Sequence, residues 1–194
     1  YEQQLDVILF SVNQYVWDFI NSWKIAIETT LDIKGRLNED PAFDQILKQS
    51  TSLKYLVITD TSLSKRKSYT LSLKDEKIEV EKIIKKLSLK DIIVRLQQYR
   101  IAGYDKIESN IFQGNSQAGD EAMALIFLTR NSQVVVLLID FPTFVEDIIV
   151  PKLEEVTSEH LAVGVFTNNN YLAIFQNENF TFEESDRDDL LNIK

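Results

Sequence analysis

Four side chains that could bind a small molecule stand close together in the sequence: Arg95, Tyr99, Arg100 and Tyr104. An arginine can hold a carboxylate through two parallel hydrogen bonds, and an aromatic face can cover a cationic group. This polar, aromatic and cationic set borders strands that are otherwise apolar. We therefore expect a small-molecule site between residues 75–104 and the central strands, with these residues nearest to it. The alternative is a solvent-facing helix end whose long side chains lie along the surface.

Residues for catalysis are scarce. The chain has no cysteine and a single histidine, His160, so disulfides, zinc–thiolate sites and cysteine nucleophiles are excluded. A Ser-His-Asp arrangement would have to use His160, and no GxSxG motif accompanies it. The glycines form neither GxGxxG nor GxxxxGK, so no nucleotide-binding loop is visible. We interpret His160 as a surface or edge residue and expect no enzyme activity and no cofactor in this chain.

Charge and composition limit the partners. The formal net charge of −9 argues against the basic surface that nucleic-acid binding requires, and against docking on anionic lipid. The acidic residues 183–189 lack the central glycine and the closing glutamate of an EF-hand, so a solvated stretch is a better interpretation than a calcium site. We expect no metal and no nucleic acid.

The first 34 residues predict one long helix. Apolar residues recur every three or four positions, and neither Gly nor Pro interrupts them. About 31 helical residues would extend about 46 Å, which is longer than a small domain is wide. We expect Phe19–Leu31 to pack on the chain's own sheet or second helix, and the part that contains Val12 and Val16 to pair with a second copy in a homodimer.

The remaining pattern predicts an α+β fold with a mostly antiparallel sheet. The run at 133–139 is apolar on both faces, which is typical of a central strand covered by helices. Ser88 and Asp91 resemble a capping box, and Pro151 should offset the helix that contains it. The expected helices are 40–49, 75–100 in two pieces and 140–156, and the expected strands are 55–59, 68–73, 107–113, 121–129, 133–139, 161–167 and 171–176.

Three stretches carry a resemblance to a known family. Asp40-Pro41-Ala42-Phe43 through Thr59-Asp60 is similar to a helix that leads into a first strand ending in Asp. Gln133–Asp140 followed by Phe141–Val156 is similar to a final apolar strand that enters an amphipathic helix, and Leu161–Gln176 is similar to a membrane-proximal hairpin. After a long first helix, this order resembles the PAS-like extracytoplasmic sensor modules called Cache or PDC domains, over residues 1 to about 176.

The resemblance implies roles for the candidate residues. It places Arg95, Tyr99, Arg100 and Tyr104 in the region that covers the ligand pocket, although no Trp stands beside an Arg as in related amino-acid-binding members. It matches Asp140 to an acidic residue that binds ligand amines in some members, whereas capping of the next helix is the interpretation we favour. It also implies that residues 1–158 form the helix and sensor module, and residues 159–194 a membrane-proximal hairpin and acidic tail.

The function implied by the resemblance is signal sensing without catalysis. The chain would be the extracytoplasmic, periplasmic part of a bacterial inner-membrane receptor, a sensor histidine kinase, that detects a small molecule or a periplasmic protein. An alternative from another class is a protein–protein assembly module whose sheet binds no small ligand. A cavity beside the central sheet favours sensing, and a filled core favours assembly. A small hydrolase would need His160 next to a serine and an acid.

Overall fold

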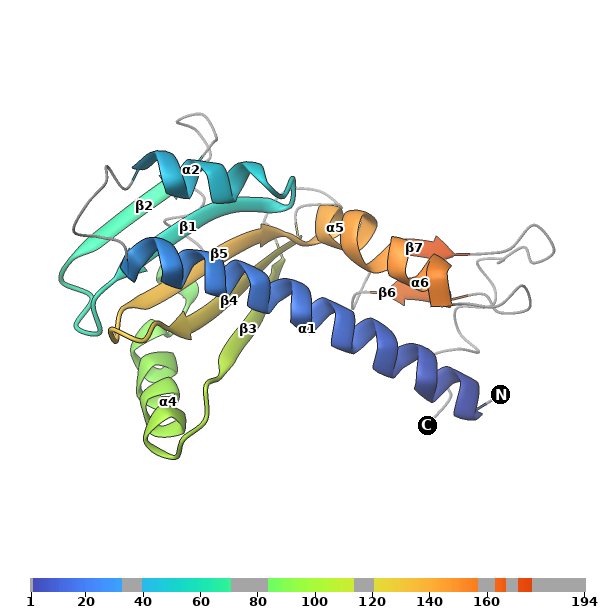
Figure 1. Cartoon of the computed structure of the whole chain (residues 1–194), viewed down its shortest axis with the longest axis horizontal. Coiled ribbons are helices and arrows are strands. Elements are labelled where there is room, and N and C mark those ends of the chain that lie inside the picture. Colours follow the sequence, from blue (N-terminus) through green and yellow to red (C-terminus); the bar gives the residue numbers. More distant parts are fainter. Residues whose placement is uncertain are drawn as a thin grey trace. The chain divides into compact units, whose positions relative to one another are not determined.

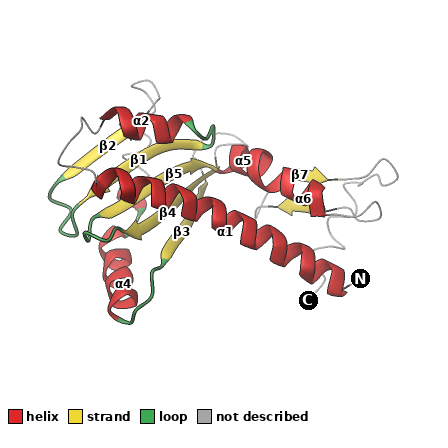
Figure 2. Ribbon diagram, in the orientation of Figure 1, coloured by secondary structure: helices red, strands yellow, loops and turns green. Residues whose placement is uncertain are grey.

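A computed structural model describes residues 2–32, 40–70, 84–113, 121–156, 163–166 and 171–175 (Figure 1). The fold class is α+β, as predicted, with a long N-terminal helix and a five-stranded antiparallel sheet (Figure 2). The chain divides into two units, one of residues 1–18 with 145–194 and the other of residues 19–144. The predicted boundary after residue 158 stays a prediction.

Helix α1 (Glu2–Asp32) covers the predicted first element. In the unit of residues 19–144, its apolar side chains Trp23, Ile27 and Leu31 are buried, and the Trp23 ring lies 5.9 Å from the ring of Phe144. This half of the helix was predicted to pack on the sheet or on the helix 40–49. It contacts the sheet, since the Lys24 ammonium lies 5.7 Å from the ring centre of Phe127, and Trp23 also contacts Phe144 of the segment after the sheet. Within the described ranges, no helix combines the length and apolarity that a membrane span needs.

The sheet has the strand order β2-β1-β5-β4-β3, and each neighbouring pair is antiparallel. Its strands are β1 (Leu53–Thr59), β2 (Arg66–Thr70), β3 (Ile107–Gln113), β4 (Glu121–Leu128) and β5 (Val134–Asp140). Strand β5 is central and buried over most of its length, as its continuous apolar run predicted. Strand β2 begins two residues before the predicted start, because the basic turn between β1 and β2 is shorter than expected.

Helices lie on both faces of the sheet (Figure 1). On one face, Ile92, Ile93 and Leu96 of α4 (Leu89–Ile101) form a buried cluster with side chains such as Val136. On the other face lies α2 (Asp40–Lys48), whose Phe43 ring is 4.6 Å from the ring of Tyr69 on β2. Successive strand residues point to opposite faces, so one strand supplies both layers of the core.

The two predicted helix N-caps, Ser88 and Asp140, have different outcomes. The Ser88 side chain makes no capping hydrogen bond at the start of α4, so the predicted capping box is wrong. The backbone carbonyl of Ser88 accepts the N–H groups of Asp91 and Ile92 instead. In contrast, the Asp140 carboxylate accepts the backbone N–H of Thr143 at 3.0 Å and caps the next helix, as predicted.

The segment expected as one helix over 140–156 consists of three pieces. They are α5 (Phe141–Phe144), a π-helical turn η1 (Val145–Ile149) and α6 (Val150–Val156). Pro151 has no N–H, and its ring conflicts with the carbonyl four residues earlier, which a wider turn relieves. The expected final hairpin is present as the antiparallel strands β6 (Val163–Phe166) and β7 (Tyr171–Phe175).

Candidate functional site: a cavity between the sheet and helix α4

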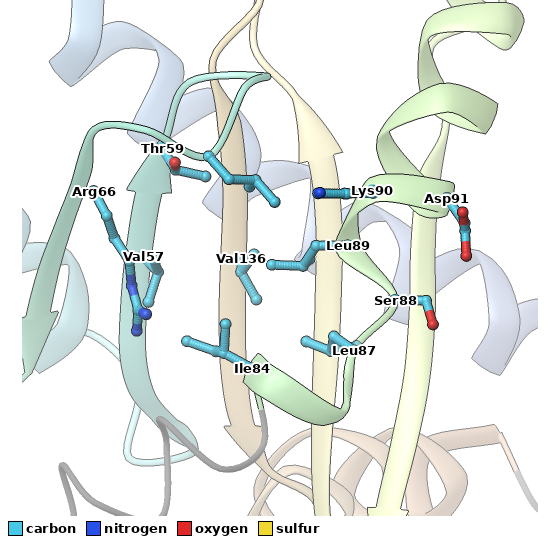
Figure 3. Close-up of a pocket in the computed structure, with 11 residues that line it drawn as sticks. Val57, Thr59, Arg66, Ile84, Leu87, Ser88, Leu89, Lys90, Asp91 and Val136 are labelled. Carbon is cyan, nitrogen blue, oxygen red and sulfur yellow. The ribbon is translucent and has the colours of Figure 1, made fainter.

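A cavity with a volume of about 480 Å³ lies on the α4 face of the sheet, within the unit of residues 19–144. Val57 of β1 and Val136 of β5 form its floor, and Ile84, Leu87 and Leu89 add apolar walls (Figure 3). All five side chains are buried. The cavity therefore offers an apolar surface to a bound molecule.

Strand register determines which basic side chain of β2 lies on the same face of the sheet as the cavity. Arg66 of β2 pairs with Thr59 of β1, two residues from Val57 along the strand. Paired residues share a face of the sheet, and so do residues two apart in a strand. The side chain of Arg66 therefore lies on the cavity side, whereas that of its neighbour Lys67 lies on the other face.

Two basic side chains line the cavity from different elements. Arg66 comes from β2, and Lys90 comes from the first turn of α4 and extends towards the cavity (Figure 3). Both side chains are exposed to solvent at the rim. Asp91 and Ser88 also border the cavity, but Figure 3 shows their side chains turned away from the floor. Thr59 also lines the cavity, and its hydroxyl donates to the carbonyl oxygen of Asp60 at 3.3 Å.

The turn between β1 and β2 is held by Asp60. Its carboxylate accepts the hydroxyl of Ser64 at 2.5 Å and the backbone N–H groups of Ser64 and Lys65 at 2.7 and 3.3 Å. These hydrogen bonds, above all that of the Ser64 hydroxyl, lower the pKa of Asp60 to about 2. The same turn places Leu63, with a φ of 59°, at the rim of the cavity.

Arg95, Tyr99 and Tyr104, three of the five residues predicted for the site, lie away from the cavity. Arg95 forms a two-pronged ion pair with Glu108 of β3, at 2.9 and 2.5 Å, which raises the pKa of the arginine. The Tyr99 ring has the Lys106 ammonium 5.3 Å from its centre, and Tyr104 is 62% exposed. These contacts belong to the surface at the C-terminal end of α4.

Arg100 and Asp140 have structural contacts. The Arg100 guanidinium donates to the carbonyl oxygen of Thr129 at 2.6 Å and lies 3.3 Å from the Ser132 hydroxyl, in the turn between β4 and β5. Asp140 caps α5 and lies 3.9 Å from the Lys54 ammonium. The predicted site residues are therefore not brought together, and their role in ligand binding stays a prediction.

The predicted region fits the cavity better than the predicted residues do. The cavity does lie between the expected helical segment and the central strands, but at the first turn of α4 and not at its last. Arg66 and Lys90 were missed because the sequence assigned Arg66 to a turn and gave no strand register. The signal that could have found Arg66 is the basic run of residues 65–67 at the start of a strand.

Other parts of the sequence predictions lie outside the described residues, namely His160, the part of the expected 75–100 helix before residue 84 and the acidic stretch 183–189. In the parts of the chain that the structure describes, no three His, Asp or Glu side chains gather where a metal ion could bind. No family model, curated protein or solved structure matches this chain.

Proposed function

We propose that this chain is a non-catalytic sensing domain that binds a small molecule in the cavity between the sheet and α4. The observation that carries the proposal is the cavity itself, about 480 Å³ in volume and lined by the strands β1, β2 and β5, the β1–β2 turn, and residues 84–91 before and at the start of α4. Small-molecule sites generally have volumes of about 300–1,000 Å³, apolar walls and a few polar groups. An assembly module would have no need of such a space beside its central strands.

The receptor to which the domain belongs is proposed on the sequence resemblance. The stretches Asp40–Asp60, Gln133–Val156 and Leu161–Gln176 resemble the sensor modules of membrane-bound histidine kinases. On that basis the domain lies on the periplasmic side of a bacterial inner membrane, and the kinase chemistry lies outside these residues. Ligand binding would be passed to the membrane through the terminal helices.

Association through α1 is the second candidate function. Val7 and Phe10 are 64% and 70% exposed in the N-terminal part of the helix. Apolar surface that stays exposed to water forgoes about 25 cal/mol for each Å² that could be buried. A group of large exposed apolar side chains is therefore typical of an interface. We propose that this part of α1 pairs with a second copy of the chain, which is compatible with sensing.

Filling the cavity tests the sensing proposal. Leu89 is buried and points towards Val136, so Leu89→Trp would place an indole in the cavity (Figure 3). Val94 lies on the same helix but is 51% exposed, so Val94→Trp is the matched control. In a thermal-shift screen of small organic compounds, we expect the compounds that raise the Tm of the wild type to act on Val94→Trp and to have no effect on Leu89→Trp.

Circular dichroism must show that Leu89→Trp is folded before its response is compared. If it is not folded, Ile84→Phe, at another residue that lines the cavity, takes its place. A screen without any stabilising compound, or compounds that stabilise the filled variant as much as the wild type, would show that this cavity is not a ligand site.

A further inference from the structure

The turn between β4 and β5, residues 129–133, contacts helices on both faces of the sheet. Helix α4 packs on the face that carries Ile126 and Leu128 of β4. The side chain of Phe127, between them, points to the other face, and there the ammonium of Lys24 of α1 lies 5.7 Å from its ring centre. The sheet therefore separates α1 from α4, and both belong to the unit of residues 19–144.

Arg100 joins the last turn of α4 to this β4–β5 turn. Its guanidinium donates to the carbonyl oxygen of Thr129 at 2.6 Å and lies 3.3 Å from the Ser132 hydroxyl. The turn is closed by hydrogen bonds of its own, because the N–H of Ser132 donates to Thr129 and the N–H of Thr129 donates to the carbonyl oxygen of Gln133, both at 2.8 Å. A displacement of Arg100 should therefore move the turn as one piece.

The two residues in the middle of the same turn contact α1. Asp32 accepts the side-chain N–H of Asn131 at 3.0 Å, and the carboxylate of Glu28 lies 3.8 Å from the Arg130 guanidinium. Glu28 and Asp32 are one helical turn apart at the C-terminal end of α1. The turn is thus held from one face by α4 and from the other face by α1.

The cavity lies at the opposite end of α4. Leu89 in the first turn of the helix lines it, whereas Arg100 is in the last turn. The 13 residues of α4 extend about 20 Å. Because a rigid helix can carry a displacement along its length, a molecule that moves the first turn of α4 should also move Arg100.

We propose that the β4–β5 turn couples the cavity to α1, with Arg100 as the input and Glu28 and Asp32 as the output. This inference rests on the proposed sensing function and adds the route by which binding reaches the helix that the receptor proposal connects to the membrane. A competing route leads through the loop after α4, where Asp105 forms an ion pair with Lys24.

Amide hydrogen exchange of residues 28–32, measured by NMR, tests the coupling without a ligand. Leu89→Trp enlarges the side chain at the cavity end of α4 and should change these exchange rates by at least about fivefold, the lower end of ordinary coupling between sites. Val94→Trp, at an exposed position of the same helix, should leave them unchanged. The amides of α2, which packs on β2 through Phe43, report any general loss of stability.

Substitution of Arg100 shows whether the turn carries the effect. In an Arg100→Gln background, Leu89→Trp should no longer change the exchange of residues 28–32. Arg95→Gln is the matched control, because it removes the same charge from the same helix but breaks an ion pair with Glu108 of β3. In that background the effect of Leu89→Trp should persist. If Leu89→Trp does not fold, Ile84→Phe replaces it in all backgrounds.

The outcomes separate this inference from the sensing proposal. Exchange at residues 28–32 that does not respond to Leu89→Trp, or a response that survives Arg100→Gln, would overturn the coupling through the turn. A response that is lost in Asp105→Ala and kept in Arg100→Gln would assign the route to the loop after α4 instead. Each of these results leaves the compound screen to decide whether the cavity binds a ligand, and a screen without a stabilising compound leaves the measured coupling unaffected.

Discussion

At the scale of single residues, Asp60 shows how one side chain can hold the rim of a site. Its carboxylate binds the Ser64 hydroxyl and two backbone N–H groups in the β1–β2 turn. This arrangement requires the ionised carboxylate, because a protonated acid is a poorer acceptor for such donors. The shape of the turn, and with it the position of Leu63 at the cavity, therefore depends on the charge of Asp60.

The pH dependence of this turn follows from the pKa of Asp60, which is lowered from 3.8 to about 2. A group whose folded pKa is depressed stabilises the fold above its unfolded pKa, and loses that contribution as the pH falls through the folded pKa. We therefore expect the contribution of Asp60 to be complete above about pH 4 and to be lost towards about pH 2.

A carbon-detected NMR titration of the Asp60 carboxyl measures this pKa directly. Ser64→Ala removes the largest of the causes and should raise the pKa towards its ordinary value, whereas Ser62→Ala should raise it less. An unchanged pKa in Ser64→Ala would mean that the hydroxyl does not hold the carboxylate.

At the scale of elements, α1 is joined to the loops beside the sheet by a row of polar side chains four residues apart. Lys24 forms an ion pair with Asp105, and its ammonium lies 5.7 Å from the ring centre of Phe127. One and two turns further on, Glu28 lies 3.8 Å from Arg130, and Asp32 accepts the amide N–H of Asn131 at 3.0 Å. The last turns of the helix are thus fixed by polar contacts as well as by apolar burial.

The Lys24–Asp105 pair should respond asymmetrically to substitution. Lys24 is 6% exposed, whereas the Asp105 side chain is 68% exposed. Asp105→Ala leaves a buried ammonium without its carboxylate, so we expect the free energy of unfolding to fall by about 2 kcal/mol. Lys24→Met keeps an apolar side chain of similar length at this position and removes the charge, so its cost should stay below about 1 kcal/mol.

Urea unfolding of both variants and of the double variant gives the comparison. The double variant should resemble Lys24→Met, because no unpaired charge remains in it. If Lys24→Met costs as much as Asp105→Ala, the loss comes from packing of the lysine stem and not from an unpaired charge.

At the scale of the whole molecule, self-association through α1 is the most direct test of the receptor proposal. The sequence placed the pairing surface at Val12 and Val16, but both are half-buried, whereas Phe10 is 70% exposed. A charge at Val12 or Val16 would therefore test folding as well as pairing. Phe10→Glu places a charge where the fold does not need an apolar group and should abolish any dimer.

Sedimentation equilibrium of wild type and variants measures this association. The concentrations should reach the millimolar range, the order that a membrane tether supplies as an effective concentration. Asn13→Glu, at an exposed polar position of the same helix, controls for the added charge. A wild-type chain that stays monomeric throughout, or a Phe10→Glu variant that still dimerises, would contradict pairing through this surface.

The sequence predicted elements better than it predicted the site, for a physical reason. A helix or a central strand is encoded locally, by the spacing of apolar residues in α1 or the unbroken apolar run of β5. The cavity depends on which strands are neighbours and in which register. The pairing of Arg66 with Thr59 is a hairpin property, and the pairing of Val57 with Val136 joins distant parts of the chain. Arg100 was a plausible ligand residue, and only the tertiary structure shows that it binds the turn between β4 and β5.

The strand order also has a consequence for how the chain reaches its native state. Strands β3, β4 and β5 follow one another in the chain and pair in sequence, whereas β1 must find β5 across the intervening half of the domain. Contacts between distant residues form late, because the loop entropy is lost before they contribute. We expect Leu125→Ala in β4 chiefly to slow refolding, and Val57→Ala in β1 chiefly to speed unfolding, in stopped-flow fluorescence. The reverse pattern would mean that the β1–β5 contact forms early. If the expected pattern is found, the cavity between β1, β5 and α4 is completed only in the last step of folding.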